Sequence, residues 1–146
     1  MKLLTTKQLI ELSHKDQVRF ALFCAYQVKN EWEKSLNCMN AIKATELWLE
    51  NKVTSLECHN AASAAFSNPS NNFYTAAYAA YAASADADAD VAATYTGYVA
   101  STAAYARATQ PTYPDDKIKI IQAQIEYYNE LKYINENFEK IVLEGL

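Results

Sequence analysis

Glycine and proline are scarce, since the 146 residues include only two glycines and three prolines. Folds rich in β-strands need many tight turns, and those turns depend largely on these two residue types. Their scarcity therefore favours long helices. Apolar residues make up 51% of the chain, which is typical of a globular protein and argues against disorder. Because this length corresponds to one domain, we expect residues 1–146 to form a single, compact all-α domain.

Long apolar runs are also missing. No stretch approaches the ~18 consecutive apolar residues of a membrane span, and residues 1–7 lack the apolar run of a secretory signal. We therefore expect a cytoplasmic protein with no membrane partner. The net charge is −4, whereas phosphate binding needs clustered Lys and Arg. Direct binding of nucleic acid is therefore not expected.

Motifs for metal binding and catalysis are absent from the sequence. Cys24, Cys38 and Cys58 are odd in number and dispersed, which fits reduced, partly buried thiols better than disulfides. Adjacent helical side chains such as Cys58 and His59 point about 100° apart and would not easily share a metal. A catalytic pair of Cys24 or Cys38 with His14 or His59 is an alternative that no motif favours. We expect no catalytic residues, no metal and no cofactor.

Capping signals and helical spacing predict a bundle of six or seven helices. Thr5 and Gln8 have the form of a capping box, and Ser13 and Thr54 precede further helix starts. Asn-rich and Pro-rich stretches at 37–40, 67–72 and 110–114 predict turns. A residue of the Asp-rich run should cap the helix that follows it, and Thr112 should cap the last helix, with a proline in its first turn. The expected helices span 5–12, 13–34, 42–49, 54–66, two segments within 73–108, and 112–143.

Residues 73–84 are expected to form the central helix of the bundle. They are rich in Ala and Tyr, and no charge lies on any face between residues 73 and 83. A helix that is apolar all round is normally buried. Ala76, Ala80 and Ala83 lie on one side, and small residues at that spacing let helix axes approach to about 8 Å.

Tyrosines recur at helical spacing along this helix and the next. A tyrosine has an apolar ring and a polar tip, and it is enriched at protein interfaces. The rings either fill a core otherwise lined by Ala or form an interface or pocket, and the sequence leaves both alternatives open. The residues are Tyr74, Tyr78 and Tyr81, followed by Tyr95, Tyr98 and Tyr105.

Positive charge is absent from residues 53–106, which contain no Lys or Arg but include Glu57 and the Asp-rich run at 86–90. These Asp side chains could favour a helix dipole, bind a partner, or serve acid–base or cation chemistry. An acidic surface rich in Tyr suits docking to a basic protein. The candidate partner-binding residues are Asp86, Asp88, Asp90, Tyr74, Tyr78, Tyr81, Tyr95 and Tyr98.

Several Ala-rich motifs occur in a characteristic order. They are FCA at 23–25, AIKATELW at 41–48, AASAA at 61–65, AAYAASA at 79–85 and AAYA at 103–106. Over about residues 18–135 the chain resembles a family of small, Ala-rich, all-helical bacterial and phage proteins called immunity proteins. The resemblance implies neutralisation of a toxin by binding, and it brings no catalytic residues.

The sequence thus predicts a binding protein, not an enzyme, that blocks a basic partner protein such as a toxin or another effector in bacterial or phage conflict. One alternative is a small enzyme or ligand-binding bundle with a pocket among Tyr, Asp and Cys or His. Another is a phage-encoded acidic inhibitor of a host nucleic-acid enzyme or defence system. A homo-oligomer is compatible with the sequence, which does not fix the oligomeric state.

Overall fold

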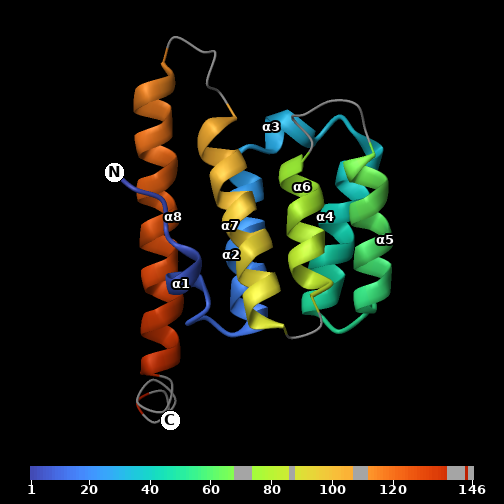
Figure 1. The fold of residues 1–146 in the computed structure, drawn as a ribbon, viewed down its shortest axis with the longest axis horizontal. Helices are drawn as coiled ribbons and strands as arrows, with labels where there is room; N and C mark the ends of the chain where they lie inside the picture. Colours follow the sequence, from blue (N-terminus) through green and yellow to red (C-terminus); the bar gives the residue numbers. More distant parts are fainter. Residues whose placement is uncertain (68–73, 86–87, 107–111, 138–143, 145–146) are drawn as a thin grey trace.

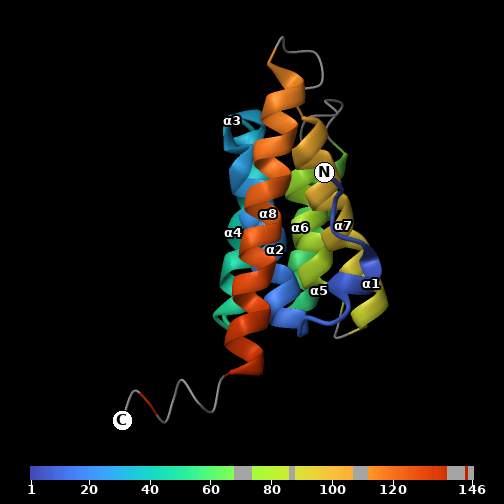
Figure 2. The ribbon, with the colours of Figure 1, turned by 90° about the vertical axis from the view of Figure 1, so that its left-hand side faces the viewer.

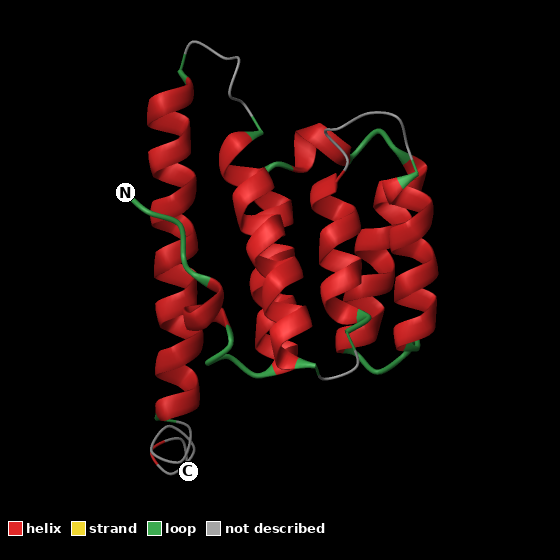
Figure 3. Ribbon diagram, viewed as in Figure 1, coloured by secondary structure: helices red, strands yellow, loops and turns green. Residues whose placement is uncertain are grey.

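Helices joined by loops and turns make up the described residues, with no strand among them (Figure 3). The computed structural model describes residues 1–67, 74–85, 88–106, 112–137 and 144. These form the expected all-α fold, with eight helices. The helices are α1 (Thr6–Leu9), α2 (His14–Gln27), α3 (Lys29–Trp32), α4 (Leu36–Leu49), α5 (Ser55–Phe66), α6 (Tyr74–Ala83), α7 (Ala89–Tyr105) and α8 (Tyr113–Glu136).

The long helices stand side by side in two layers. In Figure 1, α7 and α6 lie in front of α2 and α4, with α8 at one edge and α5 at the other. Figure 2 shows the same division from the side, with α2 and α4 opposite α6 and α7. Among the residues that the structure describes, no helix combines the length and apolarity needed to cross a bilayer.

Helix α6 is central, as its composition predicts, because it contacts α2, α4, α5 and α7. All of its residues except the tyrosines are buried, and nearly all of these are alanines. Side chains this small allow four neighbouring helices to pack against one another around α6. The tyrosines of α6 are only half-buried and lie on its outer side.

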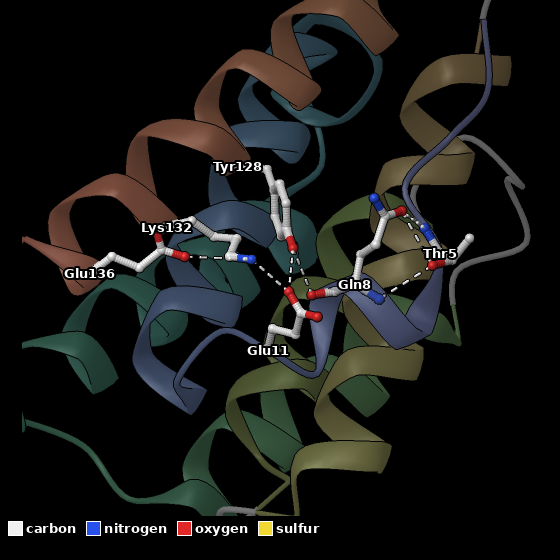
Figure 4. A network of polar contacts seen from close by, with 6 residues as sticks. All are labelled: Thr5, Gln8, Glu11, Tyr128, Lys132 and Glu136. Carbon is white, nitrogen blue, oxygen red and sulfur yellow. Dashed lines mark hydrogen bonds and ion pairs between the residues drawn. The ribbon is translucent and has the colours of Figure 1, made fainter.

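Side-chain caps begin several helices where the sequence predicts them. The Thr5 hydroxyl accepts a hydrogen bond from the Gln8 amide at 3.2 Å, and the Thr5 amide donates to the Gln8 side chain at 2.9 Å (Figure 4). Ser13 and Thr54 likewise accept amide hydrogen bonds at the starts of α2 and α5. Asp88 caps α7, which confirms the expectation that an Asp begins this helix.

The single helix expected over 13–34 is wrong, because the chain breaks at Val28 into α2 and α3. Val28 has φ −124° and ψ 35°, outside the helical region. The break places Trp32 in the core at 3% exposure. Its indole N–H donates to the Ala25 carbonyl oxygen at 2.8 Å, and its ring packs against Tyr26 with 5.6 Å between centroids.

The turn expected at 37–40 is also wrong, because α4 begins earlier, at Leu36. The Ser35 hydroxyl caps this helix by accepting from the Cys38 amide at 3.3 Å. At the start of α8 the proline lies in the first turn as expected. However, the Thr112 hydroxyl donates to the Asp116 carboxylate at 2.6 Å and does not cap an amide. The part of the last helix expected over 138–143 lies outside the described residues.

A polar network joins α1 to α8 (Figure 4). The Tyr128 hydroxyl lies 3.0 Å from the Gln8 carbonyl oxygen and 3.2 Å from the Glu11 carboxylate. The Lys132 ammonium forms ion pairs with Glu11 at 2.7 Å and with Glu136 at 3.7 Å. These contacts hold the first helix of the chain against the last one.

Candidate protein-binding surface on α5, α6 and α7

A continuous cluster of aromatic rings covers the outer side of α6 and the neighbouring helices. Tyr78 lies at its centre, with its ring centroid 5.1 Å from that of Tyr98 and 6.1 Å from that of Tyr95. Tyr81 stacks on Tyr95 at 5.2 Å. Phe66 stacks on Tyr74 at 4.5 Å. We call this cluster the tyrosine face, and it consists of Phe66, Tyr74, Tyr78, Tyr81, Tyr95 and Tyr98.

Residues of α5 complete this surface, although they were not among the residues predicted from the sequence. The His59 ring meets the Tyr81 ring edge-on at 5.5 Å, and the Ser63 hydroxyl lies 3.1 Å from the Tyr81 hydroxyl. Phe66 follows on the same side of α5. The sequence feature that could have predicted this part of the surface is the spacing of His59, Ser63 and Phe66, because residues four and three positions apart share a helix face.

The tyrosine face lies at the surface, above a layer of alanines. Tyr74, Tyr78, Tyr81 and Tyr95 are half-buried, and Tyr98 is 47% exposed. Beneath them the alanines of α6 are fully buried and fill the core. Tyr78, Tyr81 and Tyr95 pack against the core while remaining half-buried. These rings therefore combine the two alternatives that the sequence left open, with one side against the core and one side toward solvent.

Partial burial also shifts the pKa of the central hydroxyl. Burial, followed by the neighbouring Tyr98 hydroxyl, raises the pKa of Tyr78 above its usual value of 10.0. A tyrosine is neutral at physiological pH even at the usual value, so the hydroxyl can donate a hydrogen bond.

The three candidate aspartates divide into different roles. Asp88 is the N-cap of α7, and its carboxylate accepts hydrogen bonds from the amides of Asp90 at 3.1 Å and Val91 at 3.2 Å. Asp90 is exposed in the first turn of α7. Asp86 lies outside the described residues. Of the two described, Asp88 therefore has a structural role, and Asp90 is the carboxylate beside the tyrosine face.

A groove connects Asp90 to the rings of α7. It has a volume of about 330 Å³ and is open to solvent. The Thr94 hydroxyl in its wall donates to the Asp90 carbonyl oxygen at 2.8 Å and is thus directed to its own helix. We call this hollow the Asp90 groove, and its lining residues are Asp90, Val91, Thr94, Tyr95 and Tyr98.

Lysines reach tyrosine rings elsewhere in the molecule. The Lys117 ammonium lies 4.4 Å from the ring centroid of Tyr105, and the Lys132 ammonium lies 5.9 Å from that of Tyr128. Tyr105, which the spacing had grouped with Tyr95 and Tyr98, pairs instead with Tyr113 of α8 at 6.4 Å. No such cation lies over the tyrosine face within the described ranges.

The cysteines are buried and their chemistry is unfavourable for nucleophilic attack. Burial raises the pKa of Cys24 well above its usual value, and burial together with the Glu57 charge raises the pKa of Cys58 to about 11. The Cys58 thiol donates to the Ala44 carbonyl oxygen at 3.5 Å. Since the thiolate is the reactive form, these protonated thiols are poor nucleophiles.

Each histidine is engaged with groups other than a thiol. His14 Nε2 lies 2.8 Å from the Ala82 carbonyl oxygen, and its ring packs against Trp48 at 4.7 Å. His59 packs against the tyrosine face. Among the residues that the structure describes, no group of three or more His, Cys, Asp or Glu side chains is arranged to hold a metal ion.

A larger hollow of about 740 Å³ lies between α2 and α8. Two of its charged side chains, Asp16 and Arg19, form an ion pair of 2.7 Å with each other. Apolar side chains such as Leu131 and Ile134 line the other wall. Ser13, His14 and Tyr127 also line this hollow. The Ser13 hydroxyl accepts a hydrogen bond from the Asp16 amide at 3.1 Å, and His14 Nε2 lies 2.8 Å from the Ala82 carbonyl oxygen, so both side chains are engaged in contacts with the backbone.

Comparisons of the chain with protein-family models, with curated proteins and with solved structures found no match.

Proposed function

We propose that this protein is a non-enzymatic binding protein that neutralises a basic partner protein. The partner would be a toxin or another effector, as the sequence resemblance to immunity proteins suggests, and it would be met in the cytoplasm. The observation that supports this proposal most strongly is the tyrosine face, whose partly exposed rings adjoin the Asp90 groove in a chain segment without Lys or Arg.

The packing of the rings favours tight binding. Each ring of the tyrosine face already contacts one or more of its neighbours, with centroids 4.5 to 6.2 Å apart. A tyrosine has few rotatable bonds, and a ring held by its neighbours loses little further freedom when a partner covers it. The tyrosines would therefore act as rigid anchors, and the carboxylate of Asp90 would mainly accelerate association.

An acidic inhibitor that imitates DNA is a weaker candidate. Double-stranded DNA carries about one charge per 1.7 Å of its length. A protein that imitates it needs a comparable row of carboxylates. The described surface of α6 and α7 presents tyrosines there, and Asp90 is the one acidic residue that lines the groove.

A site-specific photo-crosslinker tests the proposal. It would replace Tyr98, which is 47% exposed, or Tyr26 of α2, which is 45% exposed and serves as a matched control. We expect a crosslinker at position 98 to capture a specific protein in cells that a crosslinker at position 26 does not capture. The captured protein, once purified, should bind this chain and lose its own activity. Equal capture at both positions, or a captured protein that does not bind when purified, would contradict the proposal.

Charge reversal then separates the contributions of the carboxylate and the rings. With the identified partner, Asp90→Lys should slow association and weaken its dependence on salt, because exposed charges act through screened attraction. Asp115→Lys, an equal charge change in the first turn of α8, should have little effect. Tyr98→Ala should instead raise the dissociation rate.

A further inference from the structure

We infer that the Asp90 groove receives an arginine side chain of the partner protein. This inference rests on the proposed function and adds to it the chemistry of one contact. Tyr95 and Tyr98 would hold the flat guanidinium and its alkyl stem, while the Asp90 carboxylate would accept its hydrogen bonds.

The geometry of the rings suits a flat cation. The rings of Tyr95 and Tyr98, which both line the groove, are 6.2 Å apart and inclined by 80° to each other. The ring of Tyr78 supports both, at 6.1 Å from Tyr95 and 5.1 Å from Tyr98. An aromatic face attracts a cation within about 6 Å of its centroid, and Arg makes this contact more often than Lys.

The carboxylate of Asp90 supplies the charge that the rings lack. Asp88 occupies the amides of Asp90 and Val91, so the start of α7 is capped without the Asp90 side chain. No hydrogen bond or ion pair joins the Asp90 carboxylate to another residue in the part of the chain that the structure describes. A guanidinium can bind a carboxylate through two parallel hydrogen bonds, which an ammonium cannot do.

The protein's own charges indicate that the cation comes from another kind of chain. The segment 53–106 holds four of the 17 acidic residues and none of the 13 basic ones, so the flanks carry 13 of each sign. Outside this segment a second copy carries no net charge, and the arginine within the described residues, Arg19, is ion-paired with Asp16 at 2.7 Å. The two Lys–Tyr contacts found within the described ranges, at Tyr105 and Tyr128, both use lysines of α8.

A peptide titration followed by NMR tests the inference. The probe is acetyl-Gly-Arg-Gly-amide, compared with peptides in which citrulline or lysine replaces arginine, and with tetramethylammonium chloride. We expect the arginine peptide to shift the amide signals of residues 90–98 with the highest affinity. Citrulline has nearly the same shape without the charge, so its peptide should bind at least about fivefold more weakly.

Two matched variants make the result specific. Asp90→Asn should weaken binding of the arginine peptide by about fivefold or more, whereas Asp115→Asn, in the first turn of α8, should change it by less than about twofold. Unfolding midpoints of both variants check that each is folded. Equal binding of the citrulline peptide, equal effects of the two variants, or tighter binding of tetramethylammonium would each overturn the inference.

The outcomes also separate this inference from the proposed function. If a partner captured at position 98 binds Asp90→Asn as tightly as it binds the natural chain, the arginine contact is wrong and the proposed function stands. If the arginine peptide binds selectively but no captured protein is neutralised, the groove is confirmed as an arginine site and the neutralising role is wrong.

Discussion

Tyrosines of two regions differ in what surrounds them. On α8 and its contacts, Tyr105 and Tyr128 each have a lysine over the ring, and the Tyr128 hydroxyl is bonded to α1. On the tyrosine face the rings contact one another and no described lysine or arginine. Among the described residues, the same residue type has a lysine over its ring in one region and no such cation in the other, so the second region is the one suited to a cation from outside the chain.

Burial differs between individual tyrosines of the two regions, although Tyr105 is nearly as exposed as Tyr98, at 45%. Tyr128 is 5% exposed, whereas Tyr98 is 47% exposed. The first tyrosine therefore contributes to the folded state with both its ring and its hydroxyl. The second contributes mainly through ring contacts at the surface, so its removal should affect stability far less than binding.

Replacing Tyr128 or Tyr98 by alanine should give the largest difference between two variants in the free energy of unfolding. Tyr128→Ala should lower the free energy of unfolding by about 3–5 kcal/mol, because it leaves a cavity and removes the bond to the Gln8 carbonyl oxygen. Tyr98→Ala should cost about 1 kcal/mol, the scale of surface aromatic contacts. Urea unfolding measures both, and equal costs would mean that the tyrosine face is part of the core.

A cation placed in the Asp90 groove within the same chain should give the tyrosine face the cation contact that Tyr105 and Tyr128 already have. Thr94→Arg puts a guanidinium in the wall of the Asp90 groove. It should change the free energy of unfolding by no more than about 0.5 kcal/mol, yet weaken binding of the arginine peptide by about fivefold. Thr94→Gln, which introduces a long side chain without charge, is the control, and it should weaken binding of the arginine peptide much less.

A substitution at Gly97 should change the stability of α7 without changing peptide binding by its tyrosine rings. A Cβ there would lie 3.8 Å from Leu9 Cδ1 and 4.0 Å from Thr6 Oγ1, which are ordinary contacts. Since Gly within a helix is less favourable than Ala, Gly97→Ala should stabilise the protein by about 0.5–1 kcal/mol. Thermal unfolding measures this gain. A loss of stability would show that α1 lies too close to α7, and peptide binding should not change.

The smallest expected effect concerns the ion pair of the α1–α8 network. The hydrogen bond and charge of Lys132 hold the pKa of Glu11 below 4.5. A carboxylate with a lowered pKa in the folded state stabilises it above the unfolded value, and this stabilisation is lost as pH falls through the folded value. Urea midpoints should therefore fall less between about pH 6 and pH 3 in Glu11→Gln than in the natural chain.

Glu136→Gln is the control for this measurement, because Glu136 lies farther from the same ammonium, at 3.7 Å. It should leave the acid response nearly unchanged. High salt should reduce the difference between Glu11→Gln and the natural chain, since the pair is exposed to solvent.

The sequence predicted those features of the fold that depend on neighbouring residues. The caps at Thr5, Ser13 and Thr54 use side chains within three positions of the amides that they bind. The break at Val28 was not predictable in this way, because Val28 and Trp32 continue an apolar helical stripe. The break depends on the seating of Trp32 in the core beside Ala25.

The candidate site was predicted only in part for the same reason. Spacing within one helix groups Tyr74, Tyr78 and Tyr81, but only the packing of α5 and α7 against α6 brings Phe66 and Tyr95 to them. Spacing also placed Tyr105 with Tyr98, whereas the structure directs it to Tyr113 and Lys117.

The alanine side of α6 has a consequence for how such a protein can evolve. A larger residue at Ala79 or Ala80, which are fully buried, would overpack the core at a cost of roughly 1–3 kcal/mol. On the opposite side, an exchange of rings for other residues meets solvent and leaves the helix spacing as it is. Substitutions can thus accumulate at the outer positions of α6 while the inner positions keep the packing of the helices constant.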